Sequence, residues 1–190
     1  PSRDAFGDIA VALNDMQSRL RAKMSADKAV ADDNLRVRNA LDKASTNIMV
    51  ADPDGQIVYC NEAVLGMLRN AEHDIRRDLP SFRVDGLVGR NFDAFHKNPA
   101  HQRNVLGALR GEHRATVKLG GRTFALVANP VTNAEGVRLG SVVEWVDRTA
   151  EVHAEEELAT LMQAALAGDF SRRLSTEGKR GFFVTLTEGM

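Results

Sequence analysis

The sequence has 190 residues, of which 43% are hydrophobic and 27% charged, and this balance excludes a disordered or membrane-embedded chain. Its 25 Lys and Arg residues nearly cancel 26 Asp and Glu residues, and the formal net charge of −1 argues against electrostatic binding of nucleic acid. A single cysteine, Cys60, excludes a disulfide framework and any site that needs several thiolates from one chain. No apolar run reaches the ~20 residues of a membrane span. Because the sequence starts at Pro1 rather than at a methionine, we expect it to be part of a longer protein.

Residues 1–45 have the pattern of one long helix. The region has no proline after Pro1 and no glycine after Gly7, and its apolar side chains recur mainly at steps of three and four. These side chains are Ile9, Leu13, Met16, Leu20, Val30, Val37 and Leu41. A helix cannot bury so narrow a stripe by itself, so we expect a second copy of the chain to pair with it.

The stretch from residue 46 to residue 90 predicts a hairpin and then a short helix. The apolar run 47–51 is closed by Asp52-Pro-Asp-Gly55, a strong turn signal, and 56–60 alternates as a strand does. Asn61 stands where it can cap a short helix over about 61–68. Between this helix and Arg90, glycine and proline residues interrupt the helical pattern.

A second helix and three strands complete the central region. Asn98 and Pro99 are the residue types of an N-cap and a first helical position, which predicts a helix through about Leu109. The strand-like runs are 115–119, 122–130 and 139–145, with turns at Gly120-Gly121 and at 133–136. This order indicates an α+β fold, a five-stranded antiparallel sheet with helices on one face. The expected core residues include Ile48, Val127 and Val142.

Residues 151–190 return to a helical pattern. Their apolar seam consists of Val152, Leu158, Leu161 and Ala165 and ends at Gly168. A less regular tail follows, through 169–174 and 181–186. Long helix, globular module and long helix suit the transmission of a signal along an axis. We find no paired carboxylates, nucleophile elbow or phosphate-binding loop, so we do not expect an enzyme.

Within this layout, residues 40–155 resemble a PAS domain. The likeness lies in the Asp-Pro-Asp-Gly hairpin, in Asn61 before a helix, and in the closing segment Glu144-Trp-Val-Asp-Arg-Thr149. Asp147 and Thr149 are similar to the Asp-x-Thr signature that ends many PAS domains and couples them to a following helix. The resemblance implies a PAS fold over 46–150 with long helices on both sides.

The segments Asn91-Phe-Asp-Ala-Phe-His-Lys-Asn-Pro-Ala-His-Gln-Arg103 and Leu119-Gly-Gly-Arg122, together with Trp145, resemble the haem-binding PAS domains of oxygen-sensing bacterial chemoreceptors. In that group a histidine on a short helical turn ligates the iron of haem b, and a tryptophan on the last strand donates a hydrogen bond to bound oxygen. The resemblance therefore implies that His96 is the axial ligand and Trp145 the gas-stabilising donor. We expect Leu126, on the neighbouring strand, to line the same site.

Other assignments for the site remain open. His101 is the rival iron ligand. It lies five residues after His96, within the predicted helix, and faces a different direction, so the two histidines are not expected to share one metal ion. A zinc site is poorly supported, because no third and fourth donor lie at ligand spacing. Cys60 ends a predicted strand and lies outside any flavin-photosensor motif, so a covalent flavin is not expected. Covalent haem is not expected either, because the sequence has no Cys-x-x-Cys-His motif. Arg76, Arg77, Arg83, Arg90 and His113 are weaker candidates for contacts at the haem edge.

The flanking regions carry a weaker resemblance to HAMP signalling modules, at residues 4–16 and again at 167–172 and 181–183. The implied arrangement is a HAMP-like helix over 1–45, a PAS sensor over 46–150, and an exit helix with the start of a HAMP-like element over 151–190. We therefore expect a homodimeric oxygen or gas sensor of a chemoreceptor that signals to a histidine kinase. It would lie in the cytoplasm, either by itself or as the cytoplasmic part of an inner-membrane receptor. The alternatives are a PAS domain that binds flavin or another small ligand, and an empty PAS domain that acts as a dimerisation spacer.

Overall fold

The computed structural model describes residues 2–96 and 98–169 of a chain that divides into two compact units, 1–44 and 45–190. The first unit is the helix α1, Ser2–Asp42, which forms where the helical spacing predicted it. In its apolar seam, the side chains of Leu13, Met16, Leu20, Val30 and Val37 are exposed. Asp15 and Arg19 form an exposed ion pair of 2.9 Å one turn apart, which adds little to stability. These five side chains of the seam are therefore accessible to a partner.

The second unit is built on a five-stranded antiparallel sheet, as predicted, with the strand order β2-β1-β5-β4-β3. The strands are β1 Asn47–Ala51, β2 Ile57–Cys60, β3 His113–Leu119, β4 Arg122–Thr132 and β5 Arg138–Asp147. The β3–β4 hairpin turns through Gly120 and Gly121, whose φ angles of 60° and 83° favour glycine. Because β1 pairs with β5, the first strand of this unit lies beside its last strand at the centre of the sheet.

Helix α2, Glu62–Asp78, follows β2 and is longer than the sequence predicted. Asn61 caps it as expected, since its side-chain oxygen accepts a hydrogen bond from the Val64 amide at 3.1 Å. The prediction that the helix ends near Leu68 was wrong. Ala71 and Ile75 continue the buried stripe at helical spacing, and the helix ends only at the C-cap Leu79, ahead of Pro80.

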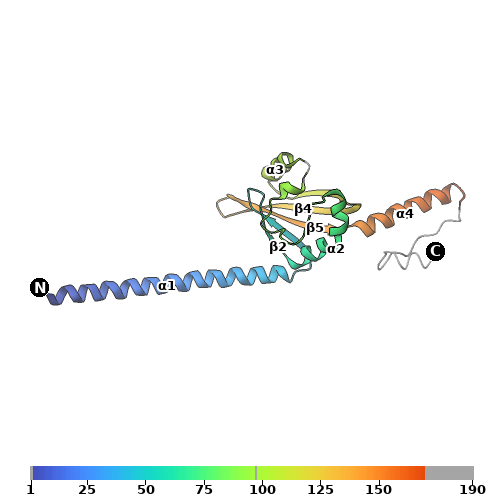
Figure 1. Ribbon diagram of the computed structural model, residues 1–190. Coiled ribbons are helices and arrows are strands. Elements are labelled where there is room, and N and C mark those ends of the chain that lie inside the picture. Colours follow the sequence, from blue (N-terminus) through green and yellow to red (C-terminus); the bar gives the residue numbers. More distant parts are fainter. Residues whose placement is uncertain (1, 97, 170–190) are drawn as a thin grey trace. The chain divides into compact units, whose positions relative to one another are not determined.

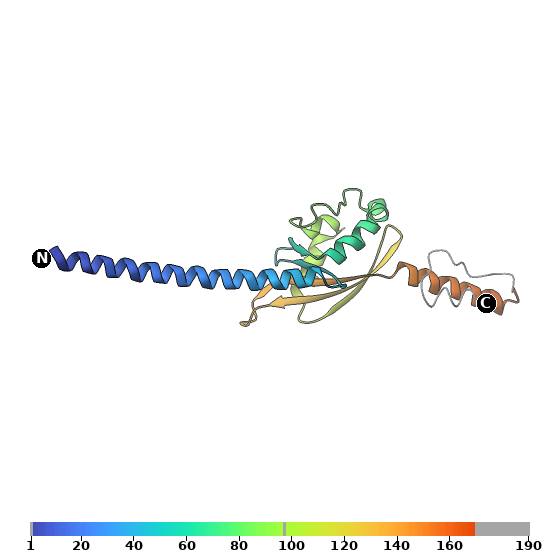
Figure 2. The same ribbon diagram turned by 90° about the horizontal axis from the view of Figure 1, so that it is seen from below.

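The remaining helical elements lie on the same side of the sheet as α2. The 3₁₀ turn η1 spans Phe92–Phe95, and α3 spans Pro99–Ala108. Asn98 caps α3 by accepting a hydrogen bond from the His101 amide at 3.2 Å, and Pro99 occupies its first turn, as predicted. Figures 1 and 2 show α2 and α3 over one face of the sheet, which leaves the other face uncovered by these elements.

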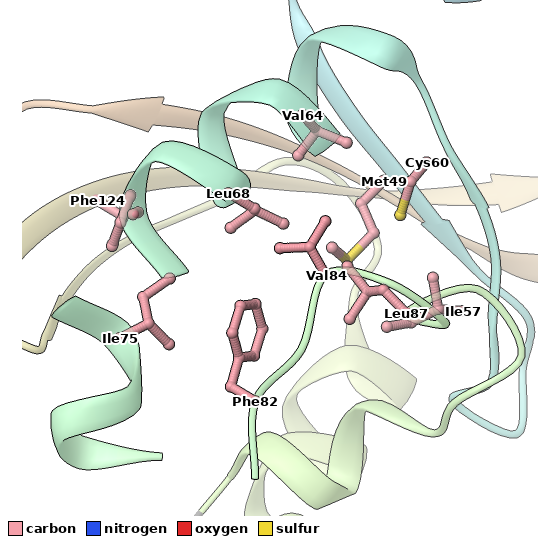
Figure 3. Packing of buried hydrophobic residues seen from close by; sticks show 11 residues of the cluster. Met49, Ile57, Cys60, Val64, Leu68, Ile75, Phe82, Val84, Leu87 and Phe124 are labelled. Atoms are coloured by element: carbon pink, nitrogen blue, oxygen red, sulfur yellow. The ribbon is translucent and has the colours of Figure 1, made fainter. Parts of the chain in front are cut away.

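The core lies between this face and the helices. Phe124 and Val64 are fully buried at its centre, and Phe82, Val84 and Leu87 enter it from the loop after α2. Figure 3 shows Phe82 and Val84 pointing toward the α2 residues Leu68 and Ile75. The loop after α2, which the sequence indicated only by its glycines and prolines, therefore contributes to the core together with the sheet and α2.

Three residues expected in this core lie elsewhere. Ile48 pairs with Glu144, which pairs in turn with Val127, and Val142 pairs with Val50. All of these alternate with the inward-facing Met49, so they occupy the opposite face of the sheet. Ile48, Val127 and Val142 are half-buried there, and their assignment to the core was wrong.

Helix α4, Thr149–Leu166, leaves the sheet directly after β5. Its chain passes out of helical geometry at Gly168, as predicted, where φ is 83°. No helix in the described part of the chain is long and apolar enough to cross a membrane. The HAMP-like element expected at the end of the sequence falls on 170–190, outside the described residues.

Candidate functional site

The inner face of the sheet brings Trp145 and Leu126 together. They are direct partners in the β4–β5 register, and the Trp145 ring stands edge-on to Phe124 at a centroid distance of 5.9 Å. Both residues are half-buried and pack against the margin of the core cluster. The side-chain amide of Asn47 donates to the Trp145 carbonyl at 2.8 Å, which anchors this end of β5 to β1. Two of the residues predicted for the site are thus neighbours.

The indole nitrogen of Trp145 is an unusual group. Within the described residues, two buried side-chain polar atoms have no hydrogen-bond partner, and they are Trp145 Nε1 and Asp93 Oδ1. An indole N–H can only donate, and a buried donor without an acceptor costs about 1–3 kcal/mol. Buried polar atoms of this kind are uncommon and need a physical explanation. The Trp145 N–H is a donor to which the described chain offers no acceptor.

His96 directly follows η1 and is its C-cap residue. Its Nδ1 lies 2.8 Å from the Phe92 carbonyl oxygen, and its ring stands edge-on to the Phe92 ring at 5.7 Å. A carbonyl oxygen only accepts, so Nδ1 must carry the proton in this hydrogen bond. In the neutral ring Nε2 then has a free lone pair, the form in which a histidine binds a metal. The side chain is exposed, so Nε2 is accessible.

The segment that carries His96 is held to the β1–β2 hairpin. Asn91 donates from its side-chain amide to the Asp54 carbonyl at 2.8 Å, and the Phe92 amide donates to the Gly55 carbonyl at 2.9 Å. Gly55 is required here, because a Cβ at this residue would lie 2.7 Å from the Phe92 ring. The turn before His96 is therefore fixed by the hairpin and not only by its own hydrogen bonds.

Two further contacts join this segment to its surroundings. Asp93 pairs with Arg103 of α3, and Phe95 packs edge-on against Phe82 of the core at 5.5 Å. Phe92 and Phe95 border the same hydrophobic cluster as Leu126 and Trp145. The structure thus connects the His96 segment to the Trp145 strand through one shared apolar core.

The rival residues have different surroundings. His101 lies in the first turn of α3 and is exposed, and His113 is exposed at the start of β3. Arg83 donates from Nη1 to the carbonyls of Pro80 and Phe82 at 3.1 and 2.7 Å, so this nitrogen is engaged by the nearby backbone. Burial raises the pKa of the Cys60 thiol to about 11, which keeps it protonated and unsuited to metal binding.

Among the residues that the structure describes, no three His, Cys, Asp or Glu side chains gather to hold a metal ion. A haem iron differs from such a site, because the porphyrin supplies most of its ligands and one protein donor is enough.

The sequence prediction named Asp147 and Thr149 but missed the polar contacts that join them to helix α2. Arg122 contacts Asp74 of α2 and Asp147 of β5, and the Asp147 carboxylate contacts Thr149. The signal available in the sequence was the spacing of Asn70, Asp74 and Asp78, which a helix places on one face. The three residues form one face only because α2 extends to Asp78, well past the predicted end of the helix.

Comparisons with known proteins identify the family of this chain. A family model described as "PAS domain" matches residues 35–98. The chain is 49% identical over 185 residues to the methyl-accepting chemotaxis protein McpB of Pseudomonas aeruginosa, and the match covers 96% of this chain and 27% of that protein. The Aer2 receptor of Vibrio cholerae, described as a dual PAS-heme oxygen sensor, has a solved structure that is 37% identical with a TM-score of 0.51. That match covers 54% of this chain and 93% of the solved one. The chain therefore belongs to the PAS domain family and is homologous to a methyl-accepting chemotaxis protein.

Proposed function

We propose that this chain is the cytoplasmic sensor module of a gas receptor that acts in chemotaxis, with haem b as its cofactor and oxygen as its preferred ligand. His96 is the proposed axial ligand, Trp145 the proposed donor to the gas, and Leu126 the apolar neighbour that keeps this donor away from water. When bound, haem b would supply an iron atom that takes up a diatomic gas. The module senses and transmits, and it is not proposed to catalyse a reaction.

The observation that carries the proposal is the buried Trp145 N–H, which has no acceptor among the described residues. A diatomic ligand that becomes negatively polarised would accept this hydrogen bond and remove the cost of the unpaired donor. Carbon monoxide is less polarised, so it gains less from the same donor. The site therefore favours oxygen by its chemistry.

The donor set also fits a haem. The hydrogen bond from His96 Nδ1 to Phe92 selects the tautomer whose Nε2 binds iron, and it makes that nitrogen a better ligand. Phe92, Phe95 and Leu126 supply apolar surface at the margin of the same core. The relative from Vibrio cholerae, described as a PAS-heme sensor, lends independent support to this choice of cofactor.

Transmission would run through the end of β5. Trp145 precedes Asp147 by two residues and Thr149 by four, so a shift of the indole reaches the start of α4 along one strand. A gas changes this equilibrium only by its different affinity for two states of the domain. We propose that α1 and α4 pair with those of a second copy, and that HAMP modules and a histidine kinase follow in the complete receptor.

An absorption spectrum of the purified chain, before and after addition of haem and then reduced with and without oxygen, tests the proposal. We expect an intense haem band that shifts on oxygenation. His96→Ala should abolish haem retention, whereas the matched variant His101→Ala should retain it. A blue flavin band would favour the redox alternative, and a colourless protein that takes up no haem would favour an empty dimerisation spacer. Loss of haem in His101→Ala alone would move the ligand to that residue.

A further inference from the structure

Arg122, the first residue of β4, connects helix α2 to the end of β5. Its Nε donates to Asp74 Oδ2 at 2.7 Å, its Nη1 to Asp147 Oδ2 at 2.9 Å, and its Nη2 to the Asn70 carbonyl at 3.1 Å. The three side chains Arg122, Asp74 and Asp147 are 26%, 28% and 22% exposed, so all lie partly within the protein. One planar guanidinium therefore holds two carboxylates from different elements.

The Asp147 carboxylate continues this connection into α4. While Oδ2 accepts from Arg122, Oδ1 accepts from the Thr149 amide at 3.0 Å and from the Thr149 hydroxyl. The Thr149 hydroxyl oxygen in turn accepts from the Thr123 amide at 3.0 Å. The first turn of α4 is thus fixed by the same carboxylate that Arg122 holds.

On the other side, the β3–β4 turn is seated on α2. The Gly120 amide donates to Asp78 Oδ2 at 2.7 Å, and a Cβ on Gly120 would lie only 1.9 Å from the Asp74 carbonyl oxygen. Asn70, Asp74 and Asp78 follow each other at helical spacing along one face of α2. A displacement of α2 must therefore move the start of β4 or break these contacts.

An adjacent face of α2 belongs to the core. Leu68, Ala71 and Ile75 are buried in the cluster that Trp145 borders, as Figure 3 shows for Leu68 and Ile75. Anything that enters or repacks this cluster acts on α2 as well as on β5. Two connections then lead to α4, one along the strand from Trp145 and one through the helix α2.

We propose that Arg122 is a positioning residue that couples α2 to the first turn of α4, as a second connection that does not pass through Trp145. The identity of the stimulus rests on the proposed function, whereas the coupling rests on the contacts of Arg122 alone. The fork geometry is required, because a lysine ammonium is a point charge that cannot hold both carboxylates and the Asn70 carbonyl in one plane.

Amide hydrogen exchange in α4, measured by mass spectrometry on peptides from the first turn of the helix, tests this coupling in the whole chain. Asp74→Asn removes the charge on α2 without touching β5 or α4. We expect at least a threefold faster exchange of the first turn of α4 in this variant, and a similar change in Arg122→Lys. The matched control Arg114→Gln removes an exposed arginine of β3 that pairs with Glu112, and it should leave α4 unchanged.

The same variants loaded with haem separate this proposal from the proposed function. Asp74→Asn should keep wild-type haem content and oxygen affinity within twofold, but lose at least half of the gas-dependent change in α4 exchange. If the wild-type chain takes up no haem, the proposed function fails, and the exchange of the haem-free variants still decides the coupling. Wild-type exchange of α4 in both Asp74→Asn and Arg122→Lys overturns the coupling, whether or not haem binds.

Discussion

Replacing Trp145 by phenylalanine keeps an aromatic ring on β5 but removes the buried N–H. In the haem-free protein the unpaired donor costs about 1–3 kcal/mol, and the variant relieves this cost. The smaller ring loses packing against Phe124 and Leu126, at a cost of about 1–2 kcal/mol, less than a truncation to alanine. The two effects nearly cancel, so we expect Trp145→Phe to change the free energy of unfolding by no more than about 1 kcal/mol.

The same variant should behave differently once haem and oxygen are bound. A hydrogen bond of about 1–3 kcal/mol that forms only in the oxygen complex corresponds to a loss of about 5- to 150-fold in oxygen affinity. Carbon monoxide affinity should fall less, and Trp145→Leu should keep haem but lose oxygen stability in the same way. Urea unfolding of the haem-free protein and oxygen dissociation kinetics of the loaded protein measure the two effects. An unfolding penalty above about 3 kcal/mol together with unchanged oxygen affinity would show that the indole is an ordinary core side chain.

Three further outcomes follow from the fold. Asn61→Ala should lower the free energy of unfolding by about 3 kcal/mol, because the fully buried side chain accepts hydrogen bonds from amides of β1 and α2 and donates one to the Thr46 carbonyl. Asn61→Ser should recover the part of this loss that is due to the helix cap. Equal losses in urea titrations of both variants would refute this account. Gly120→Ala should destabilise far more than Gly121→Ala, since both have positive φ but only the first is packed against backbone, and similar melting temperatures would contradict the close approach. Burial raises the pKa of Asp147, but hydrogen bonds from Thr149 and then from the neighbouring guanidinium outweigh this and leave the pKa below its usual value. This carboxylate therefore contributes stability above its unfolded pKa of about 3.9, and the contribution is lost as the pH falls through the folded value. Asp147→Asn should accordingly flatten the acid limb of the stability curve, and an unchanged limb would exclude the carboxylate as its source.

The sequence predicted most of the local structure because the signals were short in range. Asn61 and Asn98 were identified as helix caps from residue type and position alone, and both accept the expected hydrogen bonds. Gly120-Gly121 was identified as a hairpin turn for the same reason. The end of α2 was missed because the whole stretch from Leu68 to Arg90 was assigned to loops on account of its glycine and proline residues. The first of these is Pro80, and the buried face of the helix continues to Ile75.

The face of the sheet on which a residue lies was harder to predict from the sequence. Period-two alternation predicts that a strand has two faces, but it does not say which face the helices cover. Ile48, Val127 and Val142 were therefore assigned to the core, although their neighbours Met49, Phe124 and Ala128 occupy it. For the site, the resemblance to haem-binding PAS domains indicated His96 as iron ligand and Trp145 as donor to the gas, and Leu126 was added from its place on the neighbouring strand. These roles stay predictions that a haem titration tests.

The amino-acid order by itself determined the helices, strands and turns apart from the second half of α2, because propensity, caps and periodicity act within a few residues along the chain. Tertiary structure alone decided that the Trp145 indole is buried without an acceptor and that one arginine joins α2 to α4. Both depend on contacts between residues far apart in the sequence, such as Asp74 and Arg122, and the free energies of these contacts come from burial and hydrogen-bond geometry in the packed protein.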